Sequence, residues 1–174
     1  MDAIPHIEVA FGGLKTGVYK YHFELDDAFF EAFSNDDLRS GNVEFDVRLD
    51  KSEHATLFYF RFSGVINGFC DRCLGELPLP VSGEETLKVS FRERHAAPQV
   101  ADDNPDEVWL DEGENKIDLA QWMYEYVAVA LPMHRVHKEG ECDSETTCFI
   151  SDPEAPRVAS DDVDPRWAAL LELK

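Results

Sequence analysis

Apolar and polar side chains alternate along two consecutive stretches of the chain, residues 43–49 and 56–66. A period of two places every second side chain on one face of an extended strand, so each stretch predicts a strand with one apolar face. The polar residues 51–53 between the stretches are typical of a turn. We therefore expect an antiparallel hairpin whose apolar face is covered by a second layer.

Three further stretches predict strands, the last of them in the same sheet, and a fourth stretch predicts a short helix. Residues 7–11 and 19–25 alternate in the same way, and residues 87–91 do so downstream of a pair of prolines. Asp26 precedes the phenylalanine-rich residues 28–33, and aspartate is a favoured helix N-cap. We expect this short helix to turn its phenylalanines towards the core.

Residues 118–131 change the period from that of a strand to that of a helix. Their apolar side chains recur at intervals of three and four, which places them on one helical face. Asp118 is placed to cap this helix, Gln121 to complete a capping box, and Pro132 to end it. We therefore expect one long amphipathic helix packed on the sheet.

Together these elements predict an α+β protein, with an antiparallel β-sheet packed by one long amphipathic helix and short helices. The sheet is expected to be a meander or a partly closed barrel. A length of 174 residues with 44% apolar residues suffices for one domain with its own core. We place that single domain at residues 1–150. Residues 151–174 are expected to be an acidic linker followed by a short C-terminal helix.

The chain carries 36 acidic and 16 basic residues, a formal net charge of -20. This charge excludes the broad positive surface with which proteins wrap nucleic acid, so we expect no DNA partner. A basic protein is the favoured partner. Charges are balanced between residues 61 and 94, with five of each sign, and a local RNA contact in that segment stays open.

The first six residues carry no basic start and no apolar run, and no stretch approaches the roughly 20 apolar residues of a membrane span. Four cysteines without a secretion signal are typical of the reducing cytosol. We therefore expect a soluble cytoplasmic protein with no membrane partner.

Residues 67–75 place two cysteines, Cys70 and Cys73, in a turn flanked by glycines. Two thiols at this spacing form either half of a structural zinc site or all of a thiol redox pair. A redox pair is most effective with its first cysteine at a helix N-terminus, and residues 74–78 end in a proline that disfavours such a helix. The zinc interpretation requires a second pair of ligands.

Two downstream cysteines, separated by five intervening residues, can supply that second pair. The candidate zinc ligands are Cys70, Cys73, Cys142 and Cys148. His137, just upstream of Cys142, is an alternative fourth ligand. The gap between Cys142 and Cys148 is wider than in a usual zinc knuckle, so free thiols in a turn held by backbone hydrogen bonds remain the other possibility.

No arrangement in the sequence singles out a nucleophile with its base, a phosphate-binding glycine loop or a calcium loop. We therefore expect a protein that is not an enzyme. The alternative is an enzyme that uses the turn at Cys70 and Cys73.

Residues 70–74 read Cys-Asp-Arg-Cys-Leu and follow a strand that contains Gly64. Downstream, residues 117–119 begin a helix that ends in Ala-Leu-Pro at residues 130–132, and residues 164–170 contain a closing Asp-Pro-Arg-Trp motif. This combination, over most of the chain, resembles the bacterial YceD family, which has relatives in plastids. Many of those relatives carry a fuller cysteine-rich segment after the Leu-Pro, where this chain keeps two cysteines.

The resemblance implies a role in accumulation of the large-subunit ribosomal RNA, that is, in ribosome biogenesis. Family members are often encoded beside a small basic protein of the large subunit. We therefore expect a non-enzymatic factor that binds a large-subunit precursor through a basic ribosomal protein or through rRNA. The alternative is an enzyme acting on rRNA or on thiols. The residues expected to contact the partner are Asp71, Arg72, Arg166 and Trp167.

Overall fold

The structure is a computed structural model that describes residues 5–35, 38–52, 55–92, 106–111 and 113–142. Its main element is a five-stranded sheet of order β2-β3-β4-β5-β6. The strands are β2 (Gly17–Leu25), β3 (Ser40–Lys51), β4 (Thr56–Phe69), β5 (Glu76–Arg92) and β6 (Glu107–Asp111). Strands β2 to β5 form the predicted antiparallel meander, whereas β6 runs parallel to β5. The sheet is open, with β2 and β6 at its ends, and is not a closed barrel.

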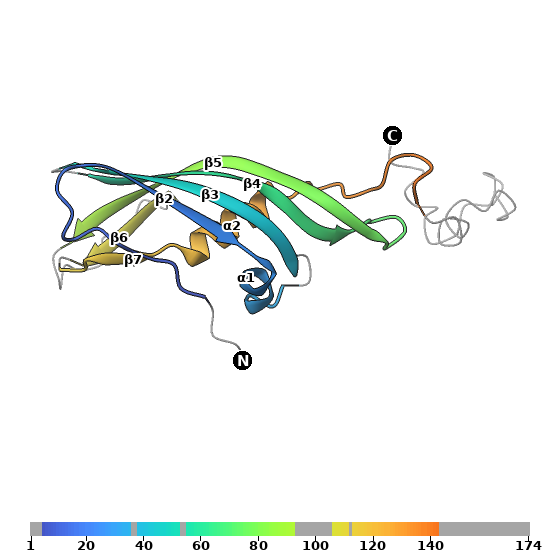
Figure 1. The fold of residues 1–174 in the computed structure, drawn as a ribbon, viewed down its shortest axis with the longest axis horizontal. Helices are drawn as coiled ribbons and strands as arrows, with labels where there is room; N and C mark the ends of the chain where they lie inside the picture. Colours follow the sequence, from blue (N-terminus) through green and yellow to red (C-terminus); the bar gives the residue numbers. More distant parts are fainter. Residues whose placement is uncertain (1–4, 36–37, 53–54, 93–105, 112, 143–174) are drawn as a thin grey trace, which may run out of the picture.

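One side of the curved sheet is covered by the remaining elements (Figure 1). In the described part of the chain, these are two helices and a small two-stranded sheet in which β1 pairs with β7. Their bounds are β1 (Glu8–Ala10), α1 (Asp27–Ala32), β7 (Lys116–Asp118) and α2 (Ala120–Ala130). The predicted cap of α1 is confirmed, because the Asp26 carboxylate accepts a hydrogen bond from the Phe29 N–H at 3.1 Å.

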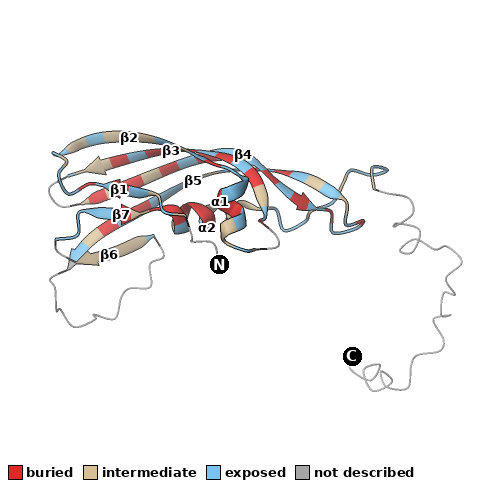
Figure 2. Ribbon diagram, turned by 60° about the horizontal axis from the view of Figure 1, so that its bottom comes forward, coloured by how far each residue is buried: buried red, intermediate tan, exposed pale blue. Residues whose placement is uncertain are grey.

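The core lies between the inner face of the sheet and these covering elements. Buried and exposed residues alternate along β3 and β4, as predicted (Figure 2). The rings of Phe45 and Phe62, which face each other across these strands, stack with centroids 4.9 Å apart. Phe29 and Phe30 of α1 and Met123 of α2 are buried in the same core. Apolar burial of this kind is the main source of stability in a domain of this size.

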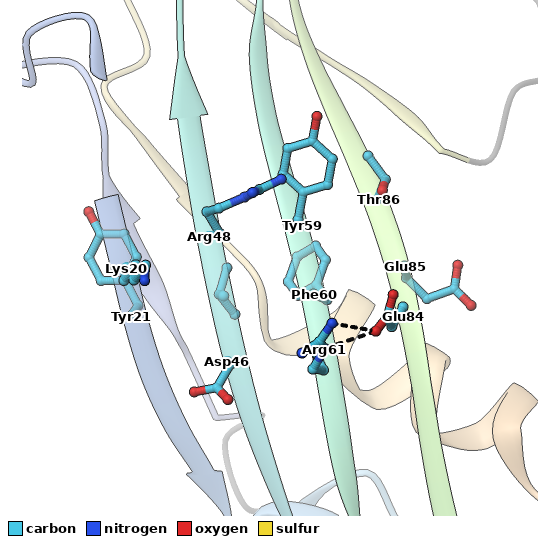
Figure 3. Close-up of a pocket in the computed structure, with 11 residues that line it drawn as sticks. Lys20, Tyr21, Asp46, Arg48, Tyr59, Phe60, Arg61, Glu84, Glu85 and Thr86 are labelled. Carbon is cyan, nitrogen blue, oxygen red and sulfur yellow. Dashed lines mark hydrogen bonds and ion pairs between the residues drawn. The ribbon is translucent and has the colours of Figure 1, made fainter. Parts of the chain in front are cut away.

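The middle of the outer face of the sheet, around Arg48 and Arg61, is polar (Figure 3). Arg61 on β4 pairs with Glu84 on β5 at 2.7 Å, and the guanidinium of Arg48 lies 4.2 Å from the centroid of the Tyr59 ring. An antiparallel sheet with one packed and one solvated face accounts for the alternation in the sequence.

The prediction of one long amphipathic helix was wrong. Helix α2 has 11 residues and begins at Ala120, after Asp118 has ended β7. Its N-cap is Leu119, which provides no side-chain cap. Asp118 still accepts a hydrogen bond from the Ala120 N–H at 3.0 Å, but Gln121 donates to Glu125 and forms no capping box. Pairing of Asp118 with β1 keeps its backbone extended, which shortens the helix.

Strand β5 starts earlier than predicted and includes Pro78 and Pro80. Proline lacks the N–H that a sheet interior requires, so it is tolerated only where a strand has a free edge. Within the described part of the chain, β6 pairs with β5 only at Lys88–Arg92, which leaves the proline-containing half of β5 at an edge. Strands β6 and β7 were not predicted from the sequence.

The ends of β4 and β5 extend beyond the other strands, and the chain that leaves α2 runs towards this end (Figure 1). Among the described residues, no helix is long and apolar enough to cross a membrane. The predicted domain boundary at residue 150 and the predicted C-terminal helix lie outside the described residues.

Candidate metal centre

The Cys-x-x-Cys turn connects the projecting ends of β4 and β5. Two backbone hydrogen bonds close it: the Cys70 N–H donates to the Gly75 carbonyl at 2.8 Å, and the Leu74 N–H donates to the Cys70 carbonyl at 2.9 Å. Leu74 has a φ of 58°, a left-handed conformation that reverses the chain. Cys70 and Cys73 are both buried. The turn therefore holds two thiols inside the tip of the hairpin.

The segment after α2 is attached to this turn first through Asp71 and Arg135. The Asp71 N–H donates to the Arg135 carbonyl at 2.6 Å, and the Arg135 N–H donates to Asp71 Oδ2 at 2.9 Å. Arg135 Nε also lies 3.8 Å from Asp71 Oδ1. This attachment fixes the position of the next residues along the segment. It brings His137 and Cys142 to the cysteine turn.

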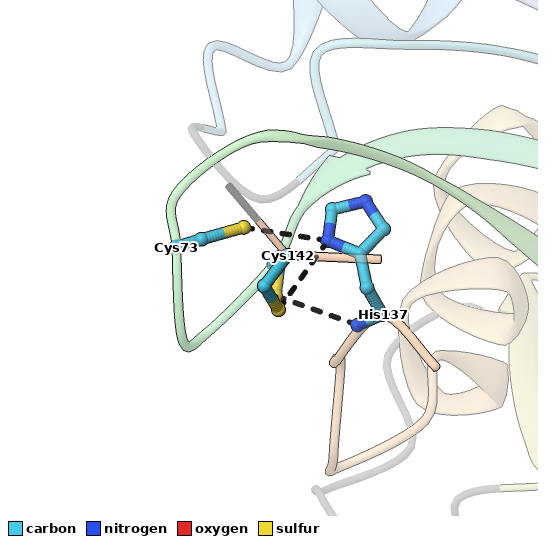
Figure 4. Close-up of side chains that lie close together, drawn as sticks. Cys73, His137 and Cys142 are labelled. Atoms are coloured by element: carbon cyan, nitrogen blue, oxygen red, sulfur yellow. Dashed lines mark hydrogen bonds between the residues drawn. The ribbon is translucent and has the colours of Figure 1, made fainter. Parts of the chain in front are cut away.

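Four potential metal ligands meet at this point, namely Cys70, Cys73, His137 and Cys142. Their ligand atoms all lie within 4.8 Å of one another. The Sγ atoms of Cys70 and Cys142 are 3.9 Å apart, too far for a disulfide. His137 Nδ1 is 3.3 Å from Cys73 Sγ and 4.0 Å from Cys142 Sγ (Figure 4).

The 3.9 Å separation between sulfurs and the 3.3 Å separation between Cys73 Sγ and His137 Nδ1 are close to the edges of a tetrahedral zinc site, and the 4.0 Å separation from Cys142 Sγ is somewhat longer. Zinc bonds of about 2.3 Å to sulfur and about 2.0 Å to nitrogen give edges of roughly 3.8 Å between two sulfurs and roughly 3.5 Å between sulfur and nitrogen. Three cysteines and one histidine are also an established donor set for structural zinc. The residues present therefore fit a zinc ion, with small side-chain movements to shorten the longer separations.

The ring of His137 is oriented for metal binding through Nδ1. Its Nε2 lies 3.0 Å from the Glu76 carbonyl oxygen, which can only accept a hydrogen bond. The proton of a neutral ring is therefore on Nε2, and the lone pair of Nδ1 faces the sulfurs. A carbonyl that orients a ligating imidazole in this way is typical of metal sites.

Backbone N–H groups surround the sulfur of Cys70. Arg72 N and His137 N lie 3.4 and 3.5 Å from Cys70 Sγ. Burial raises the pKa of Cys70, but N–H donation from His137, together with bonds from Cys73 and Arg72, outweighs burial and lowers the pKa to about 6. The thiolate, the form that binds metal, is therefore favoured at this position.

The raised pKa values of Cys142 and His137 show why a cation would stabilise the cluster. Burial and the neighbouring sulfurs of Cys73 and Cys70 raise the pKa of Cys142, since thiolates this close repel each other. The hydrogen bond with Cys73, followed by the Glu76 carbonyl, raises the pKa of His137. A divalent cation among these atoms would stabilise all three thiolates at once.

The structure brings together three of the four predicted ligands, Cys70, Cys73 and Cys142. Cys148 lies outside the described residues, and His137 supplies the fourth ligand atom. The sequence contained a signal for His137, which stands five residues before Cys142. No pattern in the sequence indicated that Arg135 would attach this segment to the cysteine turn.

The residues expected to contact a partner lie in different settings. Asp71 faces Arg135 within the chain. The side chain of Arg72 is exposed, and none of the described residues forms an ion pair with it. Arg166 and Trp167 lie outside the described residues.

A protein-family model described as large ribosomal RNA subunit accumulation protein YceD matches residues 58–174. This chain belongs to the YceD family. The match begins within β4, so it includes the cysteine turn and the whole segment that follows α2. The resemblance inferred from the sequence is thereby confirmed. Searches of curated proteins and of solved structures found no significant match.

Proposed function

We propose that this protein is a non-enzymatic assembly factor of the large ribosomal subunit. It would promote accumulation of the large-subunit rRNA by binding a basic ribosomal protein or an rRNA precursor. The observation that carries this proposal is the YceD family match, whose description names accumulation of the large ribosomal RNA subunit.

The metal centre is proposed to be a structural zinc site held by Cys70, Cys73, His137 and Cys142. Four protein ligands fill a tetrahedral zinc ion and leave no open position for a substrate, which is characteristic of structural sites. Bound zinc would supply a cross-link between the hairpin tip and the segment after α2. That cross-link would stabilise a protruding end that has little core of its own.

The charge of the chain supports a basic protein as the partner. A net charge of -20 favours association with a positively charged surface and opposes association with phosphates. Exposed Arg72 at the hairpin tip supports a local rRNA contact as the alternative.

A thiol redox role at Cys70 and Cys73 is the second candidate, and the lowered pKa of Cys70 favours it. Cys70, however, has 0% of its surface exposed, whereas a redox cysteine must be reached by its substrate. The turn also connects two strands and provides no helix N-terminus. Alkylation of Cys70 in the native, metal-loaded protein at the rate of a free thiol would favour the redox role.

Co-sedimentation tests the assembly role. Full-length protein, tagged at low copy, should migrate with large-subunit precursors in a sucrose gradient. Depletion of the protein should lower the amount of large-subunit rRNA relative to small-subunit rRNA. Migration only at the top of the gradient, with an unchanged rRNA ratio after depletion, would contradict the proposal.

A further inference from the structure

The projecting hairpin exposes apolar side chains on its outer face. Val65 and Phe69 of β4 have 43% and 51% of their surface exposed, and Leu74 in the turn has 73%. Pro80 pairs with Val65, and Pro78 is the next residue of β5 on this face. These five residues, Val65, Phe69, Leu74, Pro78 and Pro80, are called the hairpin patch below. We propose that the hairpin patch docks a basic protein segment, an inference that rests on the proposed function and specifies its partner.

Leu74 is energetically unfavourable in the free protein for two reasons, its backbone conformation and its exposure to water. Its φ of 58° lies in the left-handed region, where glycine or asparagine is the favoured residue and a branched side chain is strained. Its side chain is also largely exposed to water. A turn selected only for its shape would carry glycine or asparagine here. The leucine side chain is therefore better explained by contact with a partner than by folding of the hairpin.

The fold does not require an apolar surface at the other positions. The neighbouring residues Ile66 and Cys70 point to the opposite side of β4 and are buried. Val65 and Phe69 alternate with them and face outward. Other outward positions of the strand carry the polar residues Arg61, Ser63 and Asn67, together with the half-buried Leu57 and Tyr59. At the projecting end of the hairpin, Val65 and Phe69 flank Asn67 and form an exposed apolar surface, as expected of an interaction site.

Acidic side chains border the hairpin patch and define the charge of its partner. Glu24 of β2 pairs with Glu44 of β3, and both are exposed. Glu44 pairs in turn with Ser63 of β4, about 7 Å along the strand from Val65. At the tip, Glu76 pairs with Phe69. Like charges opposite each other are unfavourable in a sheet. His22 lies 3.8 Å from Glu24, and a bound cationic side chain would relieve the repulsion that remains between Glu24 and Glu44.

The same border argues against RNA as the occupant. Phosphates placed on the hairpin patch would lie close to Glu24, Glu44 and Glu76, which repel them. Arg61 on the outer face is neutralised by Glu84, and the exposed Arg72 in the turn is a single cation against these three carboxylates. Apolar residues with an acidic rim instead fit a protein segment that carries aliphatic or aromatic anchors between lysines and arginines.

Photo-cross-linking in the full-length chain tests the docking. A benzoylphenylalanine replaces Phe69, and the probe is the mixture of proteins extracted by high salt from purified large subunits. The expected product is a cross-link to a basic ribosomal protein, identified by mass spectrometry. The same reaction on large-subunit precursors should give the same product. Cross-linking to rRNA, or only to residues 143–174 of the same chain, overturns the proposal.

Substitutions separate docking from folding. Leu74→Asn suits the left-handed backbone, so its thermal stability should equal or exceed that of the wild type. Its affinity for the cross-linked protein should fall about tenfold, as for an interface hot spot. Val129→Asn is the control, because Val129 is 82% exposed on α2. Equal affinity of Leu74→Asn and wild type overturns the proposal.

The two proposals can fail separately. If the protein migrates with large-subunit precursors but position 69 cross-links no basic protein, the docking surface is wrong and the assembly role stands. If the protein neither migrates with precursors nor changes rRNA levels, the assembly role is wrong whatever position 69 contacts.

Discussion

His137 Nδ1 lies 3.3 Å from Cys73 Sγ, while Nε2 of the same ring lies 3.0 Å from the Glu76 carbonyl oxygen. The ring is thus held between the hairpin tip and the cysteine cluster, with its lone pair directed at the sulfurs. Among the described residues, His137 is the fourth candidate ligand of the proposed zinc site, the one that the sequence offered as an alternative.

Removal of this ring should abolish stable metal binding. His137→Ala is expected to lower the zinc content of purified protein from about one per chain to well below one, and to lower the melting temperature. His137→Cys should retain zinc, because four cysteines are also a structural zinc set. His134→Ala is the matched control, since His134 is exposed on the same segment and should keep full zinc content. Full zinc content in His137→Ala would contradict the assignment of this ligand.

The attachment between Asp71 and Arg135 should matter for stability more than Arg72 does. Asp71→Ala removes the acceptor of the Arg135 N–H and should lower the free energy of unfolding by about 1 kcal/mol. Arg72→Ala should leave stability unchanged within about 0.5 kcal/mol, because its side chain is exposed. Urea unfolding of the two variants measures the difference. Equal losses would show that the Asp71 carboxylate does not hold the turn.

Gly64 lies where β3 and β4 approach closely. A Cβ at this position would lie 2.6 Å from Val43 Cα and would also clash with the Asn42 carbonyl oxygen. Since both are backbone atoms, the strands must separate, and Gly64→Ala should cost about 2 kcal/mol or more. Gly13→Ala is the control, because no atom lies within 4 Å of the added Cβ. Urea denaturation that shows the same stability for both variants would contradict this packing.

Asp118 should make stability depend on pH below about pH 4. Partial burial raises its pKa, but hydrogen bonds from His6 and from the backbone N–H groups of Ala120 and Ile7 hold the pKa below its ordinary value of 3.8. A carboxylate with a lowered folded pKa stabilises the fold fully above its ordinary pKa. That contribution is lost as the pH falls through the folded pKa.

Asp118→Asn should therefore flatten the decline of melting temperature in this acid range. Glu114→Gln removes an exposed carboxylate from the same segment and should leave the decline unchanged. An acid profile of Asp118→Asn that superimposes on that of the wild type would show that the carboxylate is not stabilised by folding.

The strands with the clearest alternation could be predicted from the sequence, whereas pairings between distant segments could not. Val47 and Phe60 lie in stretches whose period fixes which face is buried, and both are buried. The pairing of Ile117 with Val9 joins two strands of three residues each. So short a strand carries too little periodicity to be distinguished from a loop. In the same ladder Glu8 pairs with Asp118, so the backbone of Asp118 is extended. The helix therefore begins at Ala120, later than predicted.

The metal centre could be predicted only in part, again because some of it depends on contacts between distant segments. The spacing of Cys70 and Cys73 is a local property of one turn and indicates ligands directly. The choice among His134, His137 and a second cysteine depends on how the segment after α2 lies against the hairpin. That placement is set by the contact of Asp71 with Arg135, which is 64 residues away in the sequence. No local pattern encodes such a contact.

The metal content of the native protein tests the central claim most directly. Full-length protein, purified without chelators or metal-affinity resin, is analysed by inductively coupled plasma mass spectrometry alongside the Cys70→Ser, Cys73→Ser double variant. The expected result is about one zinc per chain in the wild type and almost none in the double variant. Wild-type protein that is folded and stable with no bound metal would contradict a structural zinc site at the hairpin tip.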